Sequence, residues 1–430
     1  MSKSHTFQRI SAVCILIAVC MLCTASASAA EFSGSGTAGD PYLIQSNADM
    51  KKLAELVNEG NADYSAAHYL LTTDIALEDE EWTPVGNTGR TDFAGIFDGS
   101  GKTVTYIIEK PSSRFASLFG SNAGTIKNLN VKCIISGVYD DVVLYAGGIC
   151  GMNLQGTIEN CVVSANIDVV SEAVYVGGAA GYDSGGLIKE CFAEVELFAE
   201  SIGDGDVGVG GIVGETFGTV TNCEAYGTVL ANGEDSVYAG GIAGSNSIEE
   251  ISSSTAGVDV TVIGISDDMY SGGICGQNHG LITDCEVKRS GITATCSGED
   301  WAYTYAGGIT ARNYGDIENC ITSADVSATA TSVPAEDNDN WPQVLVGGIA
   351  GYNDGTIKNS TASGTVLGKA EGEVFSDPIV GVNDGTVKNC SAEGENMEDD
   401  LTPSDDTAES PAPIFGILGG LCAALVMTRK

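Results

Sequence analysis

Residues 146–161 read Ala146-Gly-Gly-Ile-Cys-Gly151-Met-Asn-Leu-Gln-Gly156-Thr-Ile158-Glu-Asn160-Cys161, and variants of this phrase recur through most of the chain. The other copies lie at 116–129, 176–191, 210–223, 239–254, 271–285, 306–320, 346–360 and 379–390. The phrase ends at positions 129, 161, 191, 223, 254, 285, 320, 360 and 390, so successive spacings are 30–32 residues except for two longer units of 35 and 40. A fixed period of this size indicates a stacked repeat protein.

Each copy predicts three short β-strands. One strand passes through Gly-Gly-Ile-x-Gly, a second through Gly-Thr-Ile-x-Asn-Cys, and a third alternates in polarity, as in residues 225–231. Short β-branched runs broken by Gly, Asn and Asp suit strands and turns, and no segment within the repeats is long enough for a crossover helix. A single coil of this kind cannot bury its apolar side alone, so the coils must stack. The repeats therefore predict an all-β fold: a parallel β-helix or closely related β-solenoid of about nine three-strand coils with an N-terminal α/β cap.

Stacking in one register predicts columns of equivalent residues. The paired glycines, such as those at 147–148 and 240–241, would allow positive φ or close backbone approach. An asparagine column would turn a corner, because Asn tolerates the left-handed region and can bond to the neighbouring coil. The corner column comprises Asn128, Asn160, Asn222, Asn319, Asn359 and Asn389. The inward aliphatic column comprises Ile126, Ile158, Ile188, Val220, Ile251, Ile282, Ile317, Ile357 and Val387.

The repeated phrase resembles the GLUG motif of bacterial and archaeal surface proteins, which also occurs in non-catalytic repeats of some immunoglobulin A-cleaving peptidases. The resemblance covers roughly 116–390, and its best matches are 147–161, 240–244, 307–320 and 347–360. Upstream stretches at 39–44, 82–86 and 93–99 are similar to the segment that commonly precedes such repeats. The resemblance implies a wall or surface role and no particular reaction.

Residues 31–115 are expected to cap the first rung, because an uncovered solenoid end exposes strand edges that invite aggregation. Ser46 followed by Asp49 predicts the N-terminus of a helix of about ten residues. Its apolar face would carry Leu53, Ala54, Leu56 and Val57. The repeats themselves are expected over 116–395.

Both ends of the chain have the composition of targeting segments. Residues 1–30 combine basic residues, a short apolar run and a small-residue ending, which predicts a secretory signal peptide. Residues 396–413 form an acidic linker that contains proline, and 414–430 form an apolar segment with a basic stop. This ending resembles the sorting tails of archaeal surface proteins, which a membrane-bound archaeosortase is thought to cut and replace with a lipid. A plain C-terminal membrane helix is the alternative, and both interpretations predict an extracellular protein anchored at the cell surface.

Charge restricts the class of partner. The chain has 58 acidic and 19 basic residues and a formal charge of −39, which excludes a phosphate-binding surface for nucleic acid. Such a surface favours cations and solubility in high salt. The expected partners are the cell envelope or an extracellular glycan or protein, together with the membrane through the C-terminal tail or the lipid that replaces it.

Six cysteines occupy the position that ends the phrase: Cys161, Cys191, Cys223, Cys285, Cys320 and Cys390. Because Ser254 and Ser360 occupy the same column, we expect these cysteines to form a packing ladder of free thiols. Disulfides between neighbouring coils, such as Cys161–Cys191, remain an alternative for an exported protein. Metal binding is the least favoured, since the sequence has no Cys-x-x-Cys and only three histidines.

The two longer units carry the candidate site residues. Extra residues on a solenoid form loops on one face, often the binding face, and here they surround Trp301, Tyr303, Tyr305 and Trp341. Packing of these rings over a coil edge is the alternative. The acidic run 336–340 offers Asp337 and Asp339 as possible calcium ligands, although solvated charge is the favoured explanation of the run, and no other cofactor is expected.

These features predict a surface-anchored repeat protein that acts as an adhesin, a spacer or a structural module of the envelope. The sequence assembles no catalytic constellation, so we expect no enzymatic activity. The competing hypothesis is a carbohydrate-active enzyme, a polysaccharide lyase or hydrolase, on the same β-helix scaffold.

Overall fold

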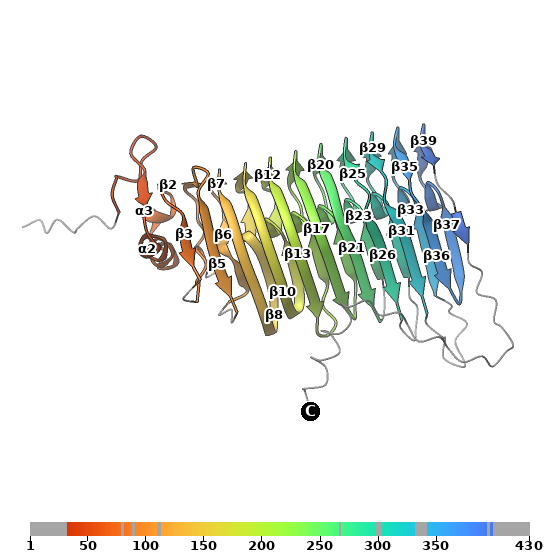
Figure 1. The fold of residues 1–430 in the computed structure, drawn as a ribbon, viewed down its shortest axis with the longest axis horizontal. Helices are drawn as coiled ribbons and strands as arrows, with labels where there is room; N and C mark the ends of the chain where they lie inside the picture. The colour runs from red at the N-terminus through yellow and green to blue at the C-terminus, as the bar shows by residue number, and fades with distance from the viewer. Residues whose placement is uncertain are drawn as a thin grey trace, which may run out of the picture. The chain divides into compact units, whose positions relative to one another are not determined.

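A computed structural model describes residues 32–78, 81–87, 91–109, 113–265, 268–297, 303–331, 342–393 and 396–398. Within these ranges the chain is a parallel β-solenoid of about ten turns, preceded by a short region that contains two helices. Figure 1 shows the rungs in chain order, from the red N-terminal region to the blue final rung. The predicted fold class is confirmed.

One side of the solenoid is a parallel sheet of 12 short strands. In spatial order they are β1 (Tyr42–Ile44), β2 (His68–Leu71), β4 (Ile96–Asp98), β7 (Thr125–Lys127), β9 (Thr157–Glu159), β12 (Leu187–Lys189), β16 (Thr219–Thr221), β20 (Glu250–Ser252), β24 (Leu281–Thr283), β29 (Asp316–Glu318), β34 (Thr356–Lys358) and β39 (Thr386–Lys388). The sheet therefore begins upstream of the repeats, inside the segment predicted to be the cap.

A second side begins just after the column of cysteines. Its strands are β3 (Ile75–Leu77), β5 (Thr103–Ile108), β8 (Asn130–Leu154), β10 (Val162–Gly177), β13 (Phe192–Ser201), β17 (Glu224–Gly233), β21 (Thr255–Gly264), β25 (Glu286–Val287), β26 (Gly291–Cys296), β30 (Ile321–Thr322), β31 (Asp325–Ala330), β35 (Thr361–Ser363), β36 (Val366–Ala370), β40 (Ser391–Glu393) and β41 (Asn396–Glu398). Inward residues alternate with outward ones along these strands, as in β13.

The third side carries the Gly-Gly-Ile-x-Gly segments, and β8 and β10 run on into it. Its other strands are β6 (Phe115–Asn122), β11 (Ala180–Ser184), β14 (Val207–Gly210), β15 (Val213–Thr216), β18 (Val237–Gly240), β19 (Ala243–Asn246), β22 (Asp268–Gly272), β23 (Cys275–Asn278), β27 (Tyr303–Gly307), β28 (Thr310–Asn313), β32 (Gln343–Gly347), β33 (Ala350–Asn353), β37 (Glu373–Asp377) and β38 (Val380–Asn383). In most rungs the strand predicted here is divided into two by a sharp bend at the paired glycines.

Of the two reasons expected for the paired glycines, close backbone approach at the bend is the one observed. None of the four glycines at 147–148 and 240–241 has positive φ. A Cβ on Gly240 would lie 2.1 Å from the carbonyl oxygen of Ala243, and a Cβ on Gly241 would lie 2.3 Å from that of Gly273. Residues with a side chain cannot fit at either position.

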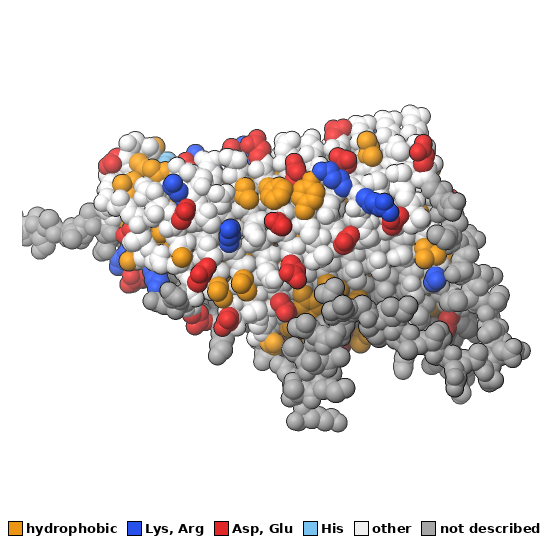
Figure 2. Space-filling model, in the orientation of Figure 1, with side chains coloured by type: hydrophobic (Ala, Val, Ile, Leu, Met, Phe, Trp, Pro, Cys, Tyr) orange, Lys and Arg blue, Asp and Glu red, His pale blue; other side chains and the backbone are white. Residues whose placement is uncertain are grey.

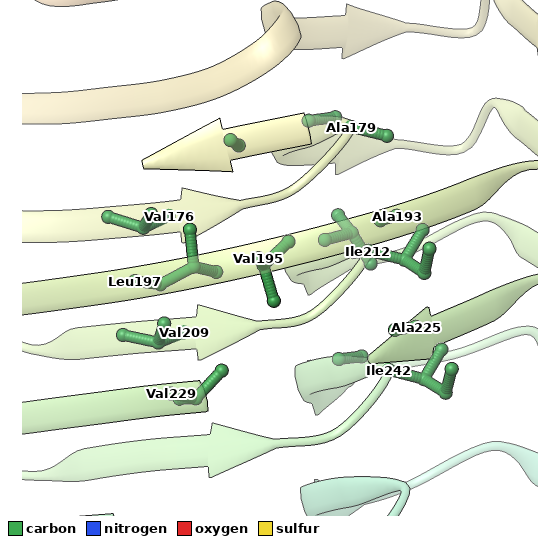
Figure 3. Packing of buried hydrophobic residues seen from close by; sticks show 14 of the residues in the cluster. Val176, Ala179, Ala193, Val195, Leu197, Val209, Ile212, Ala225, Val229 and Ile242 are labelled. Atoms are coloured by element: carbon green, nitrogen blue, oxygen red, sulfur yellow. The ribbon is translucent and has the colours of Figure 1, made fainter. Parts of the chain in front are cut away.

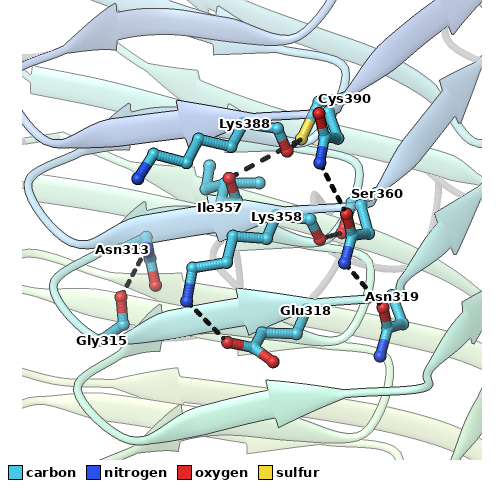
Figure 4. A network of polar contacts seen from close by, with 11 residues as sticks. Asn313, Gly315, Glu318, Asn319, Ile357, Lys358, Ser360, Lys388 and Cys390 are labelled. Carbon is cyan, nitrogen blue, oxygen red and sulfur yellow. Dashed lines mark hydrogen bonds and ion pairs between the residues drawn. The ribbon is translucent and has the colours of Figure 1, made fainter.

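The predicted corner is confirmed. Asn128, Asn160, Asn222, Asn319, Asn359 and Asn389 all have φ between 51° and 55°. In the last rungs their side chains bond to the preceding coil: Asn389 Nδ2 donates to Asn359 Oδ1, and Asn359 Nδ2 donates to Asn319 Oδ1, each at 3.3 Å (Figure 4).

Stacked apolar columns form a continuous core. The eight predicted aliphatic residues from Ile126 to Ile357 are fully buried, and Val387 in the last described rungs is partly buried. Figure 3 shows the same stacking elsewhere, with Val176 above Val209 and Ile212 close to Ile242. In-register stacking thus places like residue on like residue, as the repeat predicts.

A second asparagine column runs inside the solenoid, and sequence reasoning did not identify it. It comprises Asn122, Asn153, Asp183, Thr216, Asn246, Asn278, Asn313, Asn353 and Asn383. From Asn246 onward, each Nδ2 donates to the Oδ1 of the next rung at 2.7–2.8 Å. Hydrogen bonds are also donated to the following rung by Asn122 Nδ2, to Asn153 Oδ1, and by Asn153 Nδ2, to Asp183 Oδ1.

The N-terminal region contains α2 (Asn47–Asn58) and the single-turn α3 (Ala62–Ser65). As predicted, Ser46 caps α2 by accepting from the Asp49 amide, and Leu53, Ala54, Leu56 and Val57 are buried. Asn47 bonds to the backbone of Ala76 in β3, which fixes the helix to the first rungs. Neither helix of the described ranges is long and apolar enough to cross a membrane.

Candidate functional site

Tyrosines gather on the outside of the bent third side of the solenoid. Nine of the chain's 15 tyrosines contribute to this surface, which we call the tyrosine face: Tyr145, Tyr175, Tyr182, Tyr238, Tyr270, Tyr303, Tyr305, Tyr314 and Tyr352. Five of them open a repeated Tyr-x-Gly-Gly sequence, in which the residue before the bend points outward. That repetition is the sequence signal for the surface, and of the two tyrosines singled out near the longer units, Tyr303 and Tyr305, only Tyr305 belongs to it.

The register explains why these rings meet. Tyr238, Tyr270 and Tyr305 are direct partners in neighbouring parallel strands β18, β22 and β27. Their ring centroids lie 4.9 and 5.0 Å apart, with interplanar angles of 2° and 12°. Since the ring faces are used by the neighbouring rings and Tyr270 and Tyr305 are buried, a partner would meet the more accessible rings of the face, such as Tyr303 and Tyr314.

Arg312 in β28 lies among four of these rings. Its guanidinium carbon is 4.8 Å from the centroid of Tyr314, 5.4 Å from those of Tyr305 and Tyr352, and 6.0 Å from that of Tyr270. Cations are attracted to the negative faces of aromatic rings. The arginine therefore holds side chains from three successive rungs together.

Polar contacts fix this arrangement. Arg312 Nη1 donates to the Tyr270 hydroxyl at 2.9 Å and lies 3.6 Å from Asp268 Oδ2. The Tyr270 hydroxyl in turn donates to the same carboxylate oxygen. Burial raises the pKa of Asp268, while the bond from Tyr270 and the charge of Arg312 oppose that shift.

A shallow depression of about 560 Å³ adjoins the tyrosine face. Its lining includes the stacked pair His279 and Tyr314, whose ring centroids are 4.7 Å apart, and the strongly exposed Ile248. Glu249 and Asp316 also line it, so a ligand there would meet aromatic edges, apolar surface and carboxylate oxygens together. Burial and the nearby Arg312 lower the pKa of His279, which favours its neutral form.

The candidate site residues fall in different places. Tyr303 and Tyr305 belong to the tyrosine face, where Tyr305 is only 6% exposed and Tyr303 is half-buried. Trp301 and Trp341 lie outside the described residues, so their binding role stays a prediction. Packing explains Tyr305 more simply than ligand contact does, whereas Tyr303 keeps an accessible surface.

The calcium ligands proposed from the sequence, Asp337 and Asp339, also lie outside the described residues. In the part of the chain that the structure covers, no three His, Cys, Asp or Glu side chains converge in a metal-binding arrangement.

The six cysteines of the ladder, Cys161, Cys191, Cys223, Cys285, Cys320 and Cys390, are free thiols that line the interior. Their sulfur atoms make weak hydrogen bonds to the carbonyl two residues earlier, at 3.3–3.4 Å. Figure 4 shows Cys390, whose sulfur also lies 3.8 Å from the carbonyl oxygen of Ile357. Elsewhere in the core, burial raises the pKa of Cys133 and of Cys275 to about 12, so these two thiols are protonated at neutral pH.

A second depression, of about 610 Å³, crosses β5, β8, β10, β13 and β17 on another side. Lys132, Glu194 and Glu196 line it together with the exposed Ile134. Figure 2 shows one face of the molecule, on which acidic side chains are spread over a largely uncharged surface and a short row of hydrophobic side chains crosses the middle.

Comparison with known proteins supports the repeat motif. Residues 343–367 match the GLUG motif. Halomucin of Haloquadratum walsbyi is 30% identical over 166 residues, which cover 35% of this chain, and the chain spans only 2% of the length of that protein. A crystal structure from Bacteroides ovatus, provisionally named an immunoglobulin A1 protease, aligns with a TM-score of 0.37 and 16% identity over 84% of this chain and 86% of that one. The chain is therefore a β-solenoid that carries a GLUG motif.

Proposed function

We propose that the protein is an envelope module on the cell surface, an adhesin or spacer that contacts an extracellular glycan or protein through the tyrosine face. The observation that carries this proposal is the gathering of nine tyrosines and Arg312 on one side of a rigid repeat scaffold. Aromatic and arginine side chains are enriched where proteins bind partners. A stacked scaffold holds such side chains at fixed spacing.

Two further properties support an extracellular setting. A formal charge of −39 keeps copies of the chain apart and suits a high-salt medium, and the similarity to halomucin agrees with a surface-associated role. The predicted signal peptide over 1–30 and the predicted sorting or anchor tail over 414–430 would export the chain and tether it.

The test uses the purified full chain on arrays of neutral and acidic glycans and on envelope preparations. We expect reproducible binding that is lost in the double variant Tyr303→Ala/Tyr314→Ala and kept in Tyr226→Ala, which removes a tyrosine from a different side. Equal melting temperatures would show that the variants are folded. Binding that both variants retain would contradict the role of the tyrosine face.

The second candidate is a carbohydrate-active enzyme. The depression lined by Lys132, Glu194 and Glu196 favours it, because side grooves with carboxylates serve hydrolases and a basic residue serves lyases. The same glycans incubated with the chain and analysed for new reducing or unsaturated ends separate the two candidates. Bond cleavage that disappears in Glu194→Gln would replace the binding proposal by the enzymatic one.

A further inference from the structure

Tyr238, Tyr270 and Tyr305 form a parallel stack on three successive rungs. Their strands pair in register, and the ring planes of Tyr238 and Tyr270 differ by only 2° at a centroid distance of 4.9 Å. In-register parallel strands place the same atom of each residue above its counterpart. The ring carbons next to the hydroxyl of one tyrosine therefore lie beside those of the next.

The middle ring has a proton acceptor in place. The Tyr270 hydroxyl donates to Asp268, and Arg312 donates to the same hydroxyl oxygen at 2.9 Å. Tyr270 is 2% exposed, so its phenolic proton has little access to bulk water. When a phenol loses an electron its proton becomes strongly acidic, and a carboxylate already bonded to that proton removes it without solvent.

A route for the electron leads to the surface. Tyr303 is half-buried, and its ring centroid lies 6.1 Å from that of Tyr305, which stacks on Tyr270 at 5.0 Å. An oxidant that meets the accessible ring can thus draw an electron from the buried one through adjacent rings.

We propose that this stack is an oxidative cross-linking site, where a one-electron oxidant joins Tyr270 to Tyr238 or Tyr305 as a dityrosine. Each of the two phenols gives one electron to the oxidant and one proton to a base, which is Asp268 for Tyr270. The two phenoxyl radicals form a carbon–carbon bond between positions next to their hydroxyls. Each bonded carbon then returns its hydrogen to the oxygen by way of solvent, so two electrons and two protons leave in total.

The chain contains an internal comparison. Tyr145 and Tyr175 also stack on neighbouring rungs, at 5.7 Å and 14°, but Gly208 follows Tyr175 in the column and ends that stack. Among the described residues, no carboxylate is hydrogen-bonded to the hydroxyl of Tyr145 or Tyr175. The two stacks thus differ in ring spacing and in the presence of a proton acceptor.

This inference does not depend on the proposed function. A bond between Tyr270 and a stacking partner would tie neighbouring rungs covalently through residues about one coil apart. Because unfolding must separate these rungs, such a link would restrict the unfolded state as other cross-links do.

The test is photo-oxidation of the full chain with tris(bipyridyl)ruthenium and persulfate, followed by dityrosine fluorescence and mass spectrometry of proteolytic fragments. We expect a cross-linked fragment that contains Tyr270 with Tyr238 or Tyr305. Tyr270→Phe should abolish that fragment, while the control Tyr226→Phe should leave it unchanged. Asp268→Asn should slow its formation roughly 100-fold or more, as loss of a positioned base does.

A second variant distinguishes loss of the coupling partners from misfolding. Tyr238→Phe/Tyr305→Phe leaves Tyr270, Asp268 and Arg312 in place but removes both coupling partners, so it should also abolish the fragment while circular dichroism stays unchanged. Cross-links found only between molecules or only at Tyr145–Tyr175 would overturn the proposal. An undiminished yield in folded Tyr270→Phe would do the same.

Discussion

At the scale of single residues, the interior asparagine column contains one irregularity. Asp183 accepts hydrogen bonds from both neighbouring rungs: Asn153 Nδ2 donates to Oδ1 at 2.7 Å and the Thr216 hydroxyl donates to Oδ2 at 2.9 Å. Thr216 has only one hydroxyl hydrogen, so it cannot also donate to the next rung. Accordingly, Asn246 Oδ1 is a buried acceptor without a hydrogen-bond donor among the described residues.

Asp183→Asn should repair this column and stabilise the fold at neutral pH. Burial raises the pKa of Asp183 from 3.8 to about 6, against the opposing bonds from Asn153 and Thr216. The folded state therefore binds more protons than the unfolded state, and the contribution of Asp183 to stability falls as pH rises from about 4 to about 6. Above that window the ionised group costs about 3 kcal/mol. The new amide would donate to Thr216 Oγ1, which frees the hydroxyl for Asn246.

Chemical denaturation of wild type and Asp183→Asn at several pH values measures the effect. The variant should be more stable by up to about 3 kcal/mol at pH 8 and equal to wild type below about pH 4. Other buried carboxyls contribute equally to both proteins, so the difference isolates Asp183. A variant that is less stable at pH 8 would contradict the assignment.

The inward register predicts that Ile282→Asp is far more damaging than Thr283→Asp on the same strand. Ile282 is fully buried in the aliphatic column, whereas Thr283 points outward and is half-buried. A buried unpaired carboxylate costs at least about 4 kcal/mol, whereas an outward substitution usually changes stability by no more than about 0.5 kcal/mol. Equal shifts in melting temperature would mean that the register is wrong.

The inward direction of side chains could be predicted from the sequence, because residues of the same kind recur at the same position of each repeat. The isoleucine and corner asparagine columns recur at equal spacing, and the need to bury apolar groups decides their direction. The interior asparagines could not be assigned in the same way. A polar residue in a repeat of glycine and asparagine resembles a turn residue unless the position of its neighbours in the next rung is known.

At the scale of elements, the bend between the two strands of the third side depends on the first glycine of each pair. Gly240→Ala should cost about 2–3 kcal/mol or more, because its Cβ would lie 2.1 Å from a backbone carbonyl oxygen that cannot move away alone. Gly39→Ala is the matched control, since no heavy atom lies within 4 Å of its Cβ position. Thermal melts of both variants check the prediction, and similar stabilities would argue against a bend set by close approach.

The prediction that the two longer units carry partner-binding loops rests on the length of these units alone. Trp301 and Trp341 lie outside the described residues. We expect that Trp301→Ala/Trp341→Ala weakens attachment to the partner and leaves the melting temperature nearly unchanged, since extra residues must leave a coil whose path is fixed by its neighbours. Binding per folded molecule and thermal melts test this. Unfolding of the double variant with intact binding would show that the rings serve packing.

The tyrosine face illustrates why a binding surface is harder to predict than strands. Tyr303 and Tyr305 were noticed because they lie in a long unit, whereas Tyr238 and Tyr270 lie in units of ordinary length. Arg312 lies in the same 35-residue unit as Tyr303 and Tyr305, but no motif marks it. These tyrosines and Arg312 lie close together because the register aligns equivalent positions of neighbouring rungs. No local sequence feature links Arg312 to the tyrosines. Only the Tyr-x-Gly-Gly repetition carried the information in advance.

At the scale of the whole molecule, the excess of carboxylates should make stability depend on salt. With 58 acidic and 19 basic residues, repulsion between surface charges opposes the compact state, and salt near 1 M reduces the screening length to about 3 Å. The melting temperature should therefore rise between low salt and about 1 M NaCl. The rise should shrink near the isoelectric point, about 4.1, where the net charge vanishes. If the melting temperature rises equally with salt at neutral pH and near the isoelectric point, the cause is something other than charge repulsion.

The interior asparagine column also has a consequence for how such a chain changes its number of repeats during evolution. Asn278, Asn313 and Asn353 each receive one hydrogen bond from the preceding rung and pass one on to the next. A duplication or loss of a whole rung in this stretch joins a donor to an acceptor again, so it leaves no buried polar atom unpaired. The rungs of Asp183 and Thr216 lack this property, because the direction of donation reverses between them. Gain and loss of repeats by unequal recombination should therefore be tolerated on the C-terminal side of Thr216 and selected against across it.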